Sequence, residues 1–244
     1  MTVPTYSPSD VAGTAGAADF VGLSQIFAAV NTPAAMAGSA LAGSQDVPVL
    51  LTRPDRVLPT TMHAVSTLKP KNIVVLGGEA AVSPEVYETL GATERLAGSD
   101  RYGTAVEIAK KFSAKSDFTG YATGMNWPDS LTGGAHAAKE GGPLLLTRPD
   151  RVLATTQEAI DTLQPQKIVV LGGSAAVSDA VYNQIGASER LSGKDRYATS
   201  VDIAEEFGDH SWTYFASGMD YPDALTGGAL AAKQDSPLLL TRDN

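Results

Sequence analysis

The sequence contains no cysteine, which excludes disulfide bonds, thiol nucleophiles and cysteine-ligated metal sites. Its three histidines, His63, His136 and His210, do not recur at equivalent positions and lack the spacing of a zinc motif, which favours incidental roles over metal ligation. Glycine-rich nucleotide-binding motifs and the G-x-S-x-G nucleophile motif are also missing. We therefore expect neither a metal nor another cofactor, and we predict no catalytic residues.

Long apolar runs are missing too, and none approaches the roughly 20 residues that a membrane helix needs. The first residues, MTVPTYSPSD, lack the basic start and apolar stretch of a signal peptide. Basic residues are the minority, and the formal net charge of -9 gives no bulk attraction for nucleic acid or anionic membranes. We expect no nucleic acid partner and no membrane insertion, so an anionic partner must meet local clusters of positive charge.

An internal repeat dominates what the sequence does contain. The octapeptide LTRPDRVL at 51–58 returns unchanged at 146–153, and IVVLGG at 73–78 returns at 168–173, both with an offset of 95 residues. Two further matches are ERLAGSDRY with ERLSGKDRY, at an offset of 95, and GMNWPDSLTGG with GMDYPDALTGG, at an offset of 94. A repeat of this length indicates successive copies of one folded unit.

The copies are unequal. Near the N-terminus, SDVAGTA at 9–15 replaces SDRYGTA, and Ala34 stands where the later copies have Asp129 and Asp223. The last copy reaches only Thr241 and Arg242 of the TRPDR motif. We predict a degenerate first repeat over 1–98, a second repeat over 99–193 and a truncated third repeat over 194–244.

Periodicity and turn residues predict alternating strands and helices within each unit. Apolar strands such as PLLL and IVVL are typical of a parallel sheet covered on both faces, and short connections favour right-handed crossovers. We predict an α/β fold of tandem three-layer units with mostly parallel sheets. For one repeating unit, followed from 121 to 207, we expect strands at 121–123, 144–146, 168–171 and 189–191, and helices at 128–139, 154–163, from Ser178 to about 185, and 195–207. A third unit without its second half would expose a sheet edge and apolar surface.

Binding residues of parallel sheets gather at the carboxyl ends of the strands, and the repeated polar motifs fall there. All nine arginines occupy repeat-equivalent positions, and a guanidinium group suits carboxylate or phosphate. The candidate ligand-binding residues are Arg53, Arg101, Asn126, Trp127, Asp129, Arg148, Arg196, Tyr221, Asp223 and Arg242.

Each candidate also has a structural interpretation. The arginines could pair with Asp55, Asp100 or Asp129 to hold loops together. Trp127 and Tyr221 could pack two units together as readily as stack on a sugar. A first-turn aspartate is favoured by the helix dipole, and repeating it does not create the two unequal carboxylates of a glycosidase. The glycine pair after IVVL favours a tight turn over a phosphate site, and Tyr102 and Tyr197 favour structural roles.

Taken in order, N-W/Y-P-D, P-L-L-L-T, I-V-V-L-G-G and E-R-L-x-G-x-D-R-Y resemble the cell wall-binding repeat 2 family from about Ser9 onward. The resemblance implies Toprim-like units, commonly three in a pseudo-threefold arrangement, on secreted surface proteins of Gram-positive bacteria. It also implies non-covalent anchoring to anionic wall polymers. Some members carry a separate amidase domain, and we expect none within this sequence.

We therefore expect an extracellular, cell-wall-associated module that binds an anionic wall polysaccharide such as a teichoic acid. Two alternatives remain open. One is an adhesive or structural module whose partner is a protein, including self-association through the incomplete third unit. The other is a peptidoglycan amidase or glycosidase, for which the sequence offers no non-repeated set of catalytic residues.

Overall fold

The computed structural model describes residues 25–29, 33–112, 116–220 and 222–242. Within them, strands and helices alternate, and every strand pairing is parallel. The predicted α/β fold of tandem units with parallel sheets is therefore confirmed. The strands form three sheets, in the orders β2-β1-β3-β4, β6-β5-β7-β8 and β10-β9.

The first sheet and its helices comprise β1 (Gln25–Ala29), α2 (Pro33–Ser44), β2 (Val49–Leu51), α3 (Pro59–Leu68), β3 (Asn72–Leu76), α4 (Pro84–Leu90) and β4 (Glu94–Leu96). The second comprises α5 (Arg101–Ala109), β5 (Phe118–Thr123), α6 (Pro128–Lys139), β6 (Leu144–Thr147), α7 (Ala154–Leu163), β7 (Lys167–Leu171), α8 (Asp179–Gln184) and β8 (Glu189–Leu191). The third comprises α9 (Arg196–Glu205), β9 (Tyr214–Ser217), α10 (Pro222–Lys233) and β10 (Leu238–Thr241).

The expected elements of the second unit are all present, and α6, α7 and β8 have the predicted bounds. Ser178 caps α8 by accepting a hydrogen bond from the Val181 N–H, as predicted. The helix expected over 195–207 is shorter, because Asp195 caps it from outside by accepting bonds from two backbone N–H groups. The boundaries proposed between repeats at 98/99 and 193/194 stay a prediction, although α5 packs on β6 and α9 on β10.

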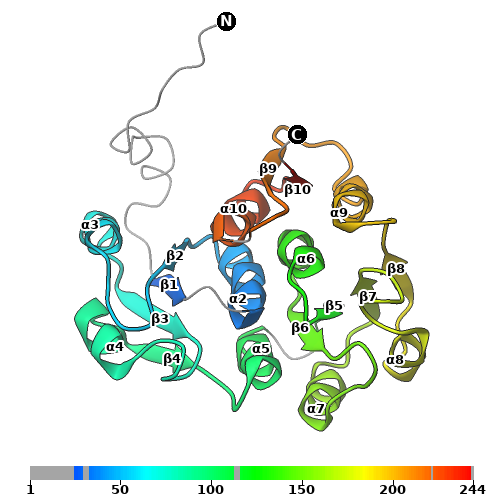
Figure 1. Ribbon diagram of the computed structural model, residues 1–244, viewed down its shortest axis with the longest axis horizontal. Helices are drawn as coiled ribbons and strands as arrows, with labels where there is room; N and C mark the ends of the chain where they lie inside the picture. The colour runs from blue at the N-terminus through cyan, green and yellow to red at the C-terminus, as the bar shows by residue number, and fades with distance from the viewer. Residues whose placement is uncertain (1–24, 30–32, 113–115, 221, 243–244) are drawn as a thin grey trace, which may run out of the picture.

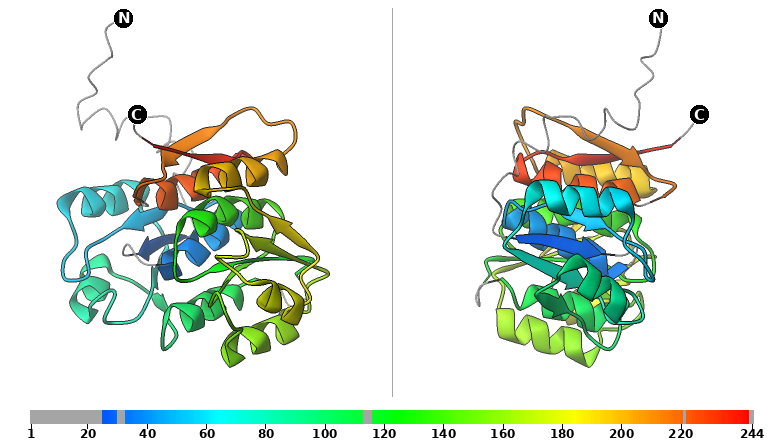
Figure 2. Two further views of the ribbon diagram at one scale, coloured as in Figure 1. Left: turned by 45° about the vertical axis from the view of Figure 1, so that its right-hand side comes forward. Right: turned by 90° about the vertical axis from the view of Figure 1, so that its left-hand side faces the viewer.

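The three equivalent helices α2, α6 and α10 meet at the centre, where each contacts the other two (Figure 1). The three sheets lie outside them, and Figure 2 shows the third sheet over one end of the molecule. Inward-facing residues of all three sheets share one core with the central helices. This arrangement around a common centre is what the pseudo-threefold prediction requires.

Side chains alternate between this shared core and separate outer cores, as expected for strands with period two. In the second unit, Leu144 and Leu146 point inward, whereas Leu145 joins an outer core with α7 and α8. The first unit has an outer core of its own around Val75. The layers of the first two units are therefore helix, sheet and helix.

The third unit differs on its outer face. Among the described residues, β9 pairs only with β10, whereas the equivalent strands β1 and β5 are paired on both sides. Phe215 on β9 is 67% exposed and Val201 on α9 is 48% exposed. The predicted exposure of a sheet edge and apolar surface is confirmed.

Candidate functional site

Two arginines occupy matching positions at the starts of α5 and α9. Arg101 donates from one guanidinium nitrogen to the Gly124 carbonyl, and Arg196 donates to the Gly218 carbonyl, both at 2.7 Å. Each glycine directly follows one of the equivalent strands β5 and β9. The repeat therefore holds a guanidinium group at the carboxyl end of the same strand in both units.

Glycine is needed at both positions, Gly124 and Gly218, because a tyrosine ring packs against each of them. A Cβ on Gly124 would overlap the Tyr102 ring, and one on Gly218 would overlap the Tyr197 ring. Tyr102 is buried, which supports the structural role expected for it.

Trp127 and Arg196 meet where the second unit adjoins the third. The Arg196 guanidinium lies 5.1 Å from the centre of the Trp127 ring, a cation–π distance. Trp127 is half-buried and occupies the N-cap position of α6, and its backbone N–H donates to the side chain of the exposed Asn126 at 3.0 Å. The indole therefore packs against the next unit while part of it stays open to solvent.

Asp129 lies in the first turn of α6, beside the glycine pair that ends β7. Gly172 has φ of 104°, and a Cβ there would overlap the Asp129 carboxylate. Burial raises the pKa of Asp129 to about 6, with the nearby Arg196 guanidinium acting in the opposite direction. Glycine is thus required by both backbone conformation and close approach, which supports the tight-turn interpretation.

Two other arginines hold the glycine turns in place. Arg95 donates to the Gly77 carbonyl and Arg190 to the Gly172 carbonyl, each at 2.8 Å. Each guanidinium lies 5.0 Å from the centre of a tyrosine ring on the preceding helix, Tyr87 on α4 or Tyr182 on α8. Their bonds to backbone carbonyls support a structural role.

The equivalent arginines at the ends of the edge strands do not share one environment. Arg148 is half-buried, 5.5 Å from the centre of the Tyr102 ring, and its buried Nε has no acceptor among the described residues. Arg53 is exposed. The two equivalent arginines therefore differ in exposure, and the ring that faces Arg148 belongs to Tyr102 of the second repeat.

The remaining candidates are dispersed. Arg242 and Asp223 are exposed in the third unit, and Tyr221 lies outside the described residues. Arg56 and Arg151 form exposed ion pairs with the preceding aspartates, at 2.9 and 2.8 Å, which contribute little to stability.

Five candidates gather at the carboxyl edge of the second sheet, and we call them the second-sheet rim: Arg101, Trp127, Asp129, Arg148 and Arg196. They carry three guanidinium groups against one carboxylate, in a chain of net charge -9. Sequence reasoning overlooked Met125, which is 59% exposed beside this rim. Its recurrence as Met219 in the repeated GMN/GMD motif was the available signal.

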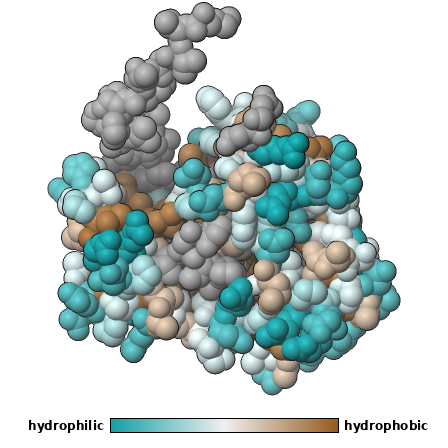
Figure 3. Space-filling view, viewed as in Figure 1, coloured by the Kyte–Doolittle hydropathy of each residue, from teal (hydrophilic) through white to brown (hydrophobic). Residues whose placement is uncertain are grey.

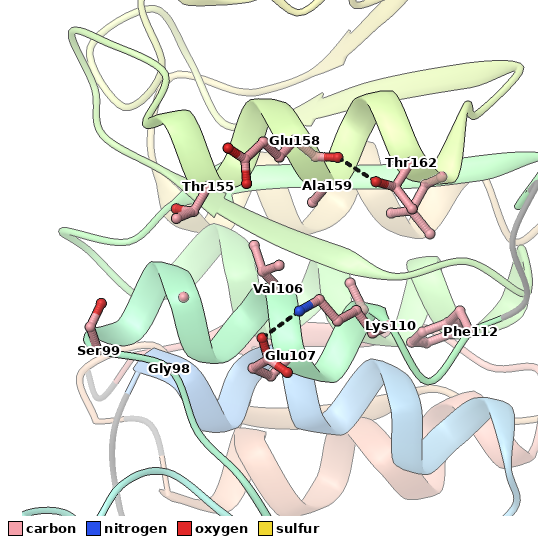
Figure 4. Close-up of a pocket in the computed structure, with 13 residues that line it drawn as sticks. Gly98, Ser99, Val106, Glu107, Lys110, Phe112, Thr155, Glu158, Ala159 and Thr162 are labelled. Atoms are coloured by element: carbon pink, nitrogen blue, oxygen red, sulfur yellow. Dashed lines mark hydrogen bonds and ion pairs between the residues drawn. The ribbon is translucent and has the colours of Figure 1, made fainter.

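A groove of about 370 Å³ lies elsewhere, between α5 and α7. Figure 4 shows the Glu107–Lys110 ion pair on one wall and Glu158 and Thr162 on the other. None of the residues predicted from the sequence lines it, so it is separate from the second-sheet rim.

Similar proteins identify the fold and the family. The family model described as cell wall binding domain 2 matches residues 10–87, 95–182 and 190–244. Cwp6 from Clostridium difficile aligns with a TM-score of 0.83 at 24% identity, over 91% of this chain and 38% of that one. Cwp8 from the same species aligns with a TM-score of 0.80 at 26% identity, over 91% and 41%.

Two curated relatives come from Bacillus subtilis. N-acetylmuramoyl-L-alanine amidase LytC is 32% identical over 85% of this chain, and an amidase enhancer is 31% identical over 84%. The matched regions cover 42% and 29% of those proteins. Three family matches in tandem, spanning most of the sequence, show that this chain belongs to the cell wall binding domain 2 family.

Proposed function

We propose that this chain is a non-catalytic anchoring module that binds an anionic wall glycopolymer along the second-sheet rim. The observation that carries the proposal is the Arg196 guanidinium held 5.1 Å from the centre of the partly open Trp127 ring at the end of a strand, on a protein that is acidic overall. A strongly negative protein gains nothing from bulk attraction to a polyanion. Positive charge at the second-sheet rim provides a local attraction for a polyanion, which the net charge of the chain does not provide.

The rim offers two kinds of contact that a charged glycan can use. The guanidinium groups of Arg148 and Arg196 suit phosphate or carboxylate. The open part of Trp127 offers a flat apolar surface to a sugar ring. On the face in Figure 3, hydrophilic residues predominate and apolar ones form small areas, as suits a ligand bound along a surface.

The family supports a binding role at the bacterial cell wall, and we extend that to an extracellular location for this chain. The relatives named as an amidase and an amidase enhancer match it over less than half of their length, in the region of the repeats. These observations favour anchoring over hydrolysis.

The decisive experiment compares Arg196→Gln with Arg101→Gln. Both arginines make the same 2.7 Å bond to a glycine carbonyl, so both variants lose the same structural contact. Only Arg196 faces a tryptophan and an aspartate, since the first repeat has Thr32 and Ala34 at those positions. Sedimentation with purified Gram-positive walls should show at least about tenfold weaker binding for Arg196→Gln and a smaller loss for Arg101→Gln.

Walls stripped of their anionic polymer should bind the unaltered chain poorly, and added salt should weaken binding to intact walls. Equal binding to stripped and intact walls would remove the anionic polymer from the proposal. Unchanged wall binding by Arg196→Gln would remove the second-sheet rim from the proposal.

A further inference from the structure

The groove between α5 and α7 lies within the second unit and is large enough to hold a ligand (Figure 4). Its volume of about 370 Å³ equals that of roughly a dozen water molecules, at about 30 Å³ each. Ligand pockets in proteins have volumes of about 300–1,000 Å³. Val106 and Leu163 form an apolar floor, and the small residues Gly103, Ala109 and Ala159 leave the space between the two helices open.

Acidic side chains predominate on the walls of this groove. On the α5 wall, Glu107 forms an ion pair with Lys110 at 2.6 Å. On the α7 wall, the Glu158 carboxylate has no ion-pair partner among the described residues. One carboxylate is therefore available to a cation. This arrangement is specific to the second unit, because the first repeat has His63 in place of Glu158 and the third has Glu205 in place of Lys110.

The two ends of the groove differ in chemistry. Ser99 and Thr155 line one end, where α5 and α7 begin, and Phe112 lines the other, where both helices end (Figure 4). A helix C-terminus carries a partial negative charge, so the two helix ends add to the negative potential of the carboxylates. A ligand that lies along the groove therefore meets an aromatic ring, then a negatively charged middle, and then two hydroxyl groups.

We propose that this groove binds a short peptide that carries a basic side chain next to an apolar one. The basic group pairs with the Glu158 carboxylate, and the apolar side chain packs on the floor beside Phe112. Peptide groups reach the hydroxyl groups of Ser99 and Thr155 at the other end. The same carboxylates repel a polyanion, so this site is separate from the second-sheet rim and does not depend on wall binding there.

Backbone amide NMR of the full chain, titrated with the blocked tripeptide acetyl-Leu-Lys-Gly-amide, tests the proposal. Amides of α5 and α7 along the groove should shift and saturate. The Glu158→Gln variant should bind the peptide about two- to fivefold more weakly, as expected for an exposed ion pair. Asp161→Asn, on the same helix but outside the groove, should bind it unchanged. Lys110→Gln should bind it more tightly, because this change frees the Glu107 carboxylate.

A tripeptide with an acetylated lysine side chain keeps the length of the probe and removes its charge, so it should bind more weakly than the charged probe. Absence of saturable shifts, or equal binding of the two tripeptides, would overturn the proposal. Equal affinity for hexylamine would assign the groove to simple amines and overturn the peptide as its ligand. Glu158→Gln should sediment with Gram-positive walls like the unaltered chain, and Arg196→Gln should bind the tripeptide unchanged. Failure of this proposal is therefore distinguishable from failure of the wall-binding proposal.

Discussion

Replacing Asp129 with asparagine should stabilise the protein at alkaline pH, although the residue lies in the first turn of a helix. Burial raises the pKa of its carboxyl from 3.8 to about 6. A shift of roughly two units corresponds to about 3 kcal/mol against the ionised folded state, at about 1.4 kcal/mol per unit. Loss of the favourable interaction with the helix dipole offsets only about 0.3–1 kcal/mol of this. The burial cost is the larger effect, so a net stabilisation of about 2 kcal/mol is expected at pH 8.

The direction of the predicted stability change follows from how the protonation of Asp129 depends on pH. Between pH 3.8 and about 6, the folded chain keeps a proton on Asp129 that the unfolded chain releases. This residue therefore lowers the free energy of unfolding as the pH rises through that range, and the full loss is present above pH 6. The advantage of Asp129→Asn should be large at pH 8 and nearly absent at pH 4.

Thermal unfolding of both proteins at the two pH values measures the difference. At pH 8 the variant should melt roughly 4–8 °C higher, given 2–4 °C per kcal/mol for a chain of this size. Asp223→Asn is the matched control, because Asp223 occupies the same turn of α10 but is exposed, and it should change the melting temperature little. An Asp129→Asn variant that is less stable at pH 8, or equally stabilised at both pH values, would refute the reasoning.

Two further predictions also use the repeat as an internal control. Gly133→Ala should destabilise the protein by about 1–3 kcal/mol in urea unfolding, because its Cβ would overlap Leu171. The equivalent Gly227→Ala should be neutral or stabilising by up to about 1 kcal/mol, since its Cβ finds ordinary space, and equal effects would contradict this account. His136 is buried with both ring nitrogens unpaired among the described residues, and burial lowers its pKa to about 4. Leucine occupies this position in both other repeats, so His136→Leu should add about 1–3 kcal/mol at pH 7. Between pH 6.5 and 4, the unfolded chain binds a proton on His136 that the folded chain does not bind. As the pH falls through this range, the free energy of unfolding should therefore decrease more in the unaltered protein than in His136→Leu. If the free energy of unfolding depended on pH in the same way in both proteins over this range, titration of His136 would not be the cause.

The elements of the fold could be predicted because their signals are local. Pro128 at the start of α6, the Ser178 cap and the glycine turn after IVVL each act through neighbours within a few residues. The continuously apolar LLL and IVVL likewise predicted strands covered on both faces, and the structure places their alternate side chains in the shared core and an outer core. Because the motifs are duplicated, the second unit predicted the elements of the third, including the exposure of its outer face.

The sequence by itself determined that successive copies of one α/β unit place arginines at strand ends. Only the tertiary structure decided which of those arginines lie near which partners. Arg196 reaches Trp127 and Asp129 because its helix packs against the preceding unit, and the pKa of Asp129 rises because that packing buries it. Arg148 lies over Tyr102 while Arg53 stays exposed. Contacts between units depend on how whole sheets and helices are oriented around the common core, and a repeat in the sequence carries no record of that orientation.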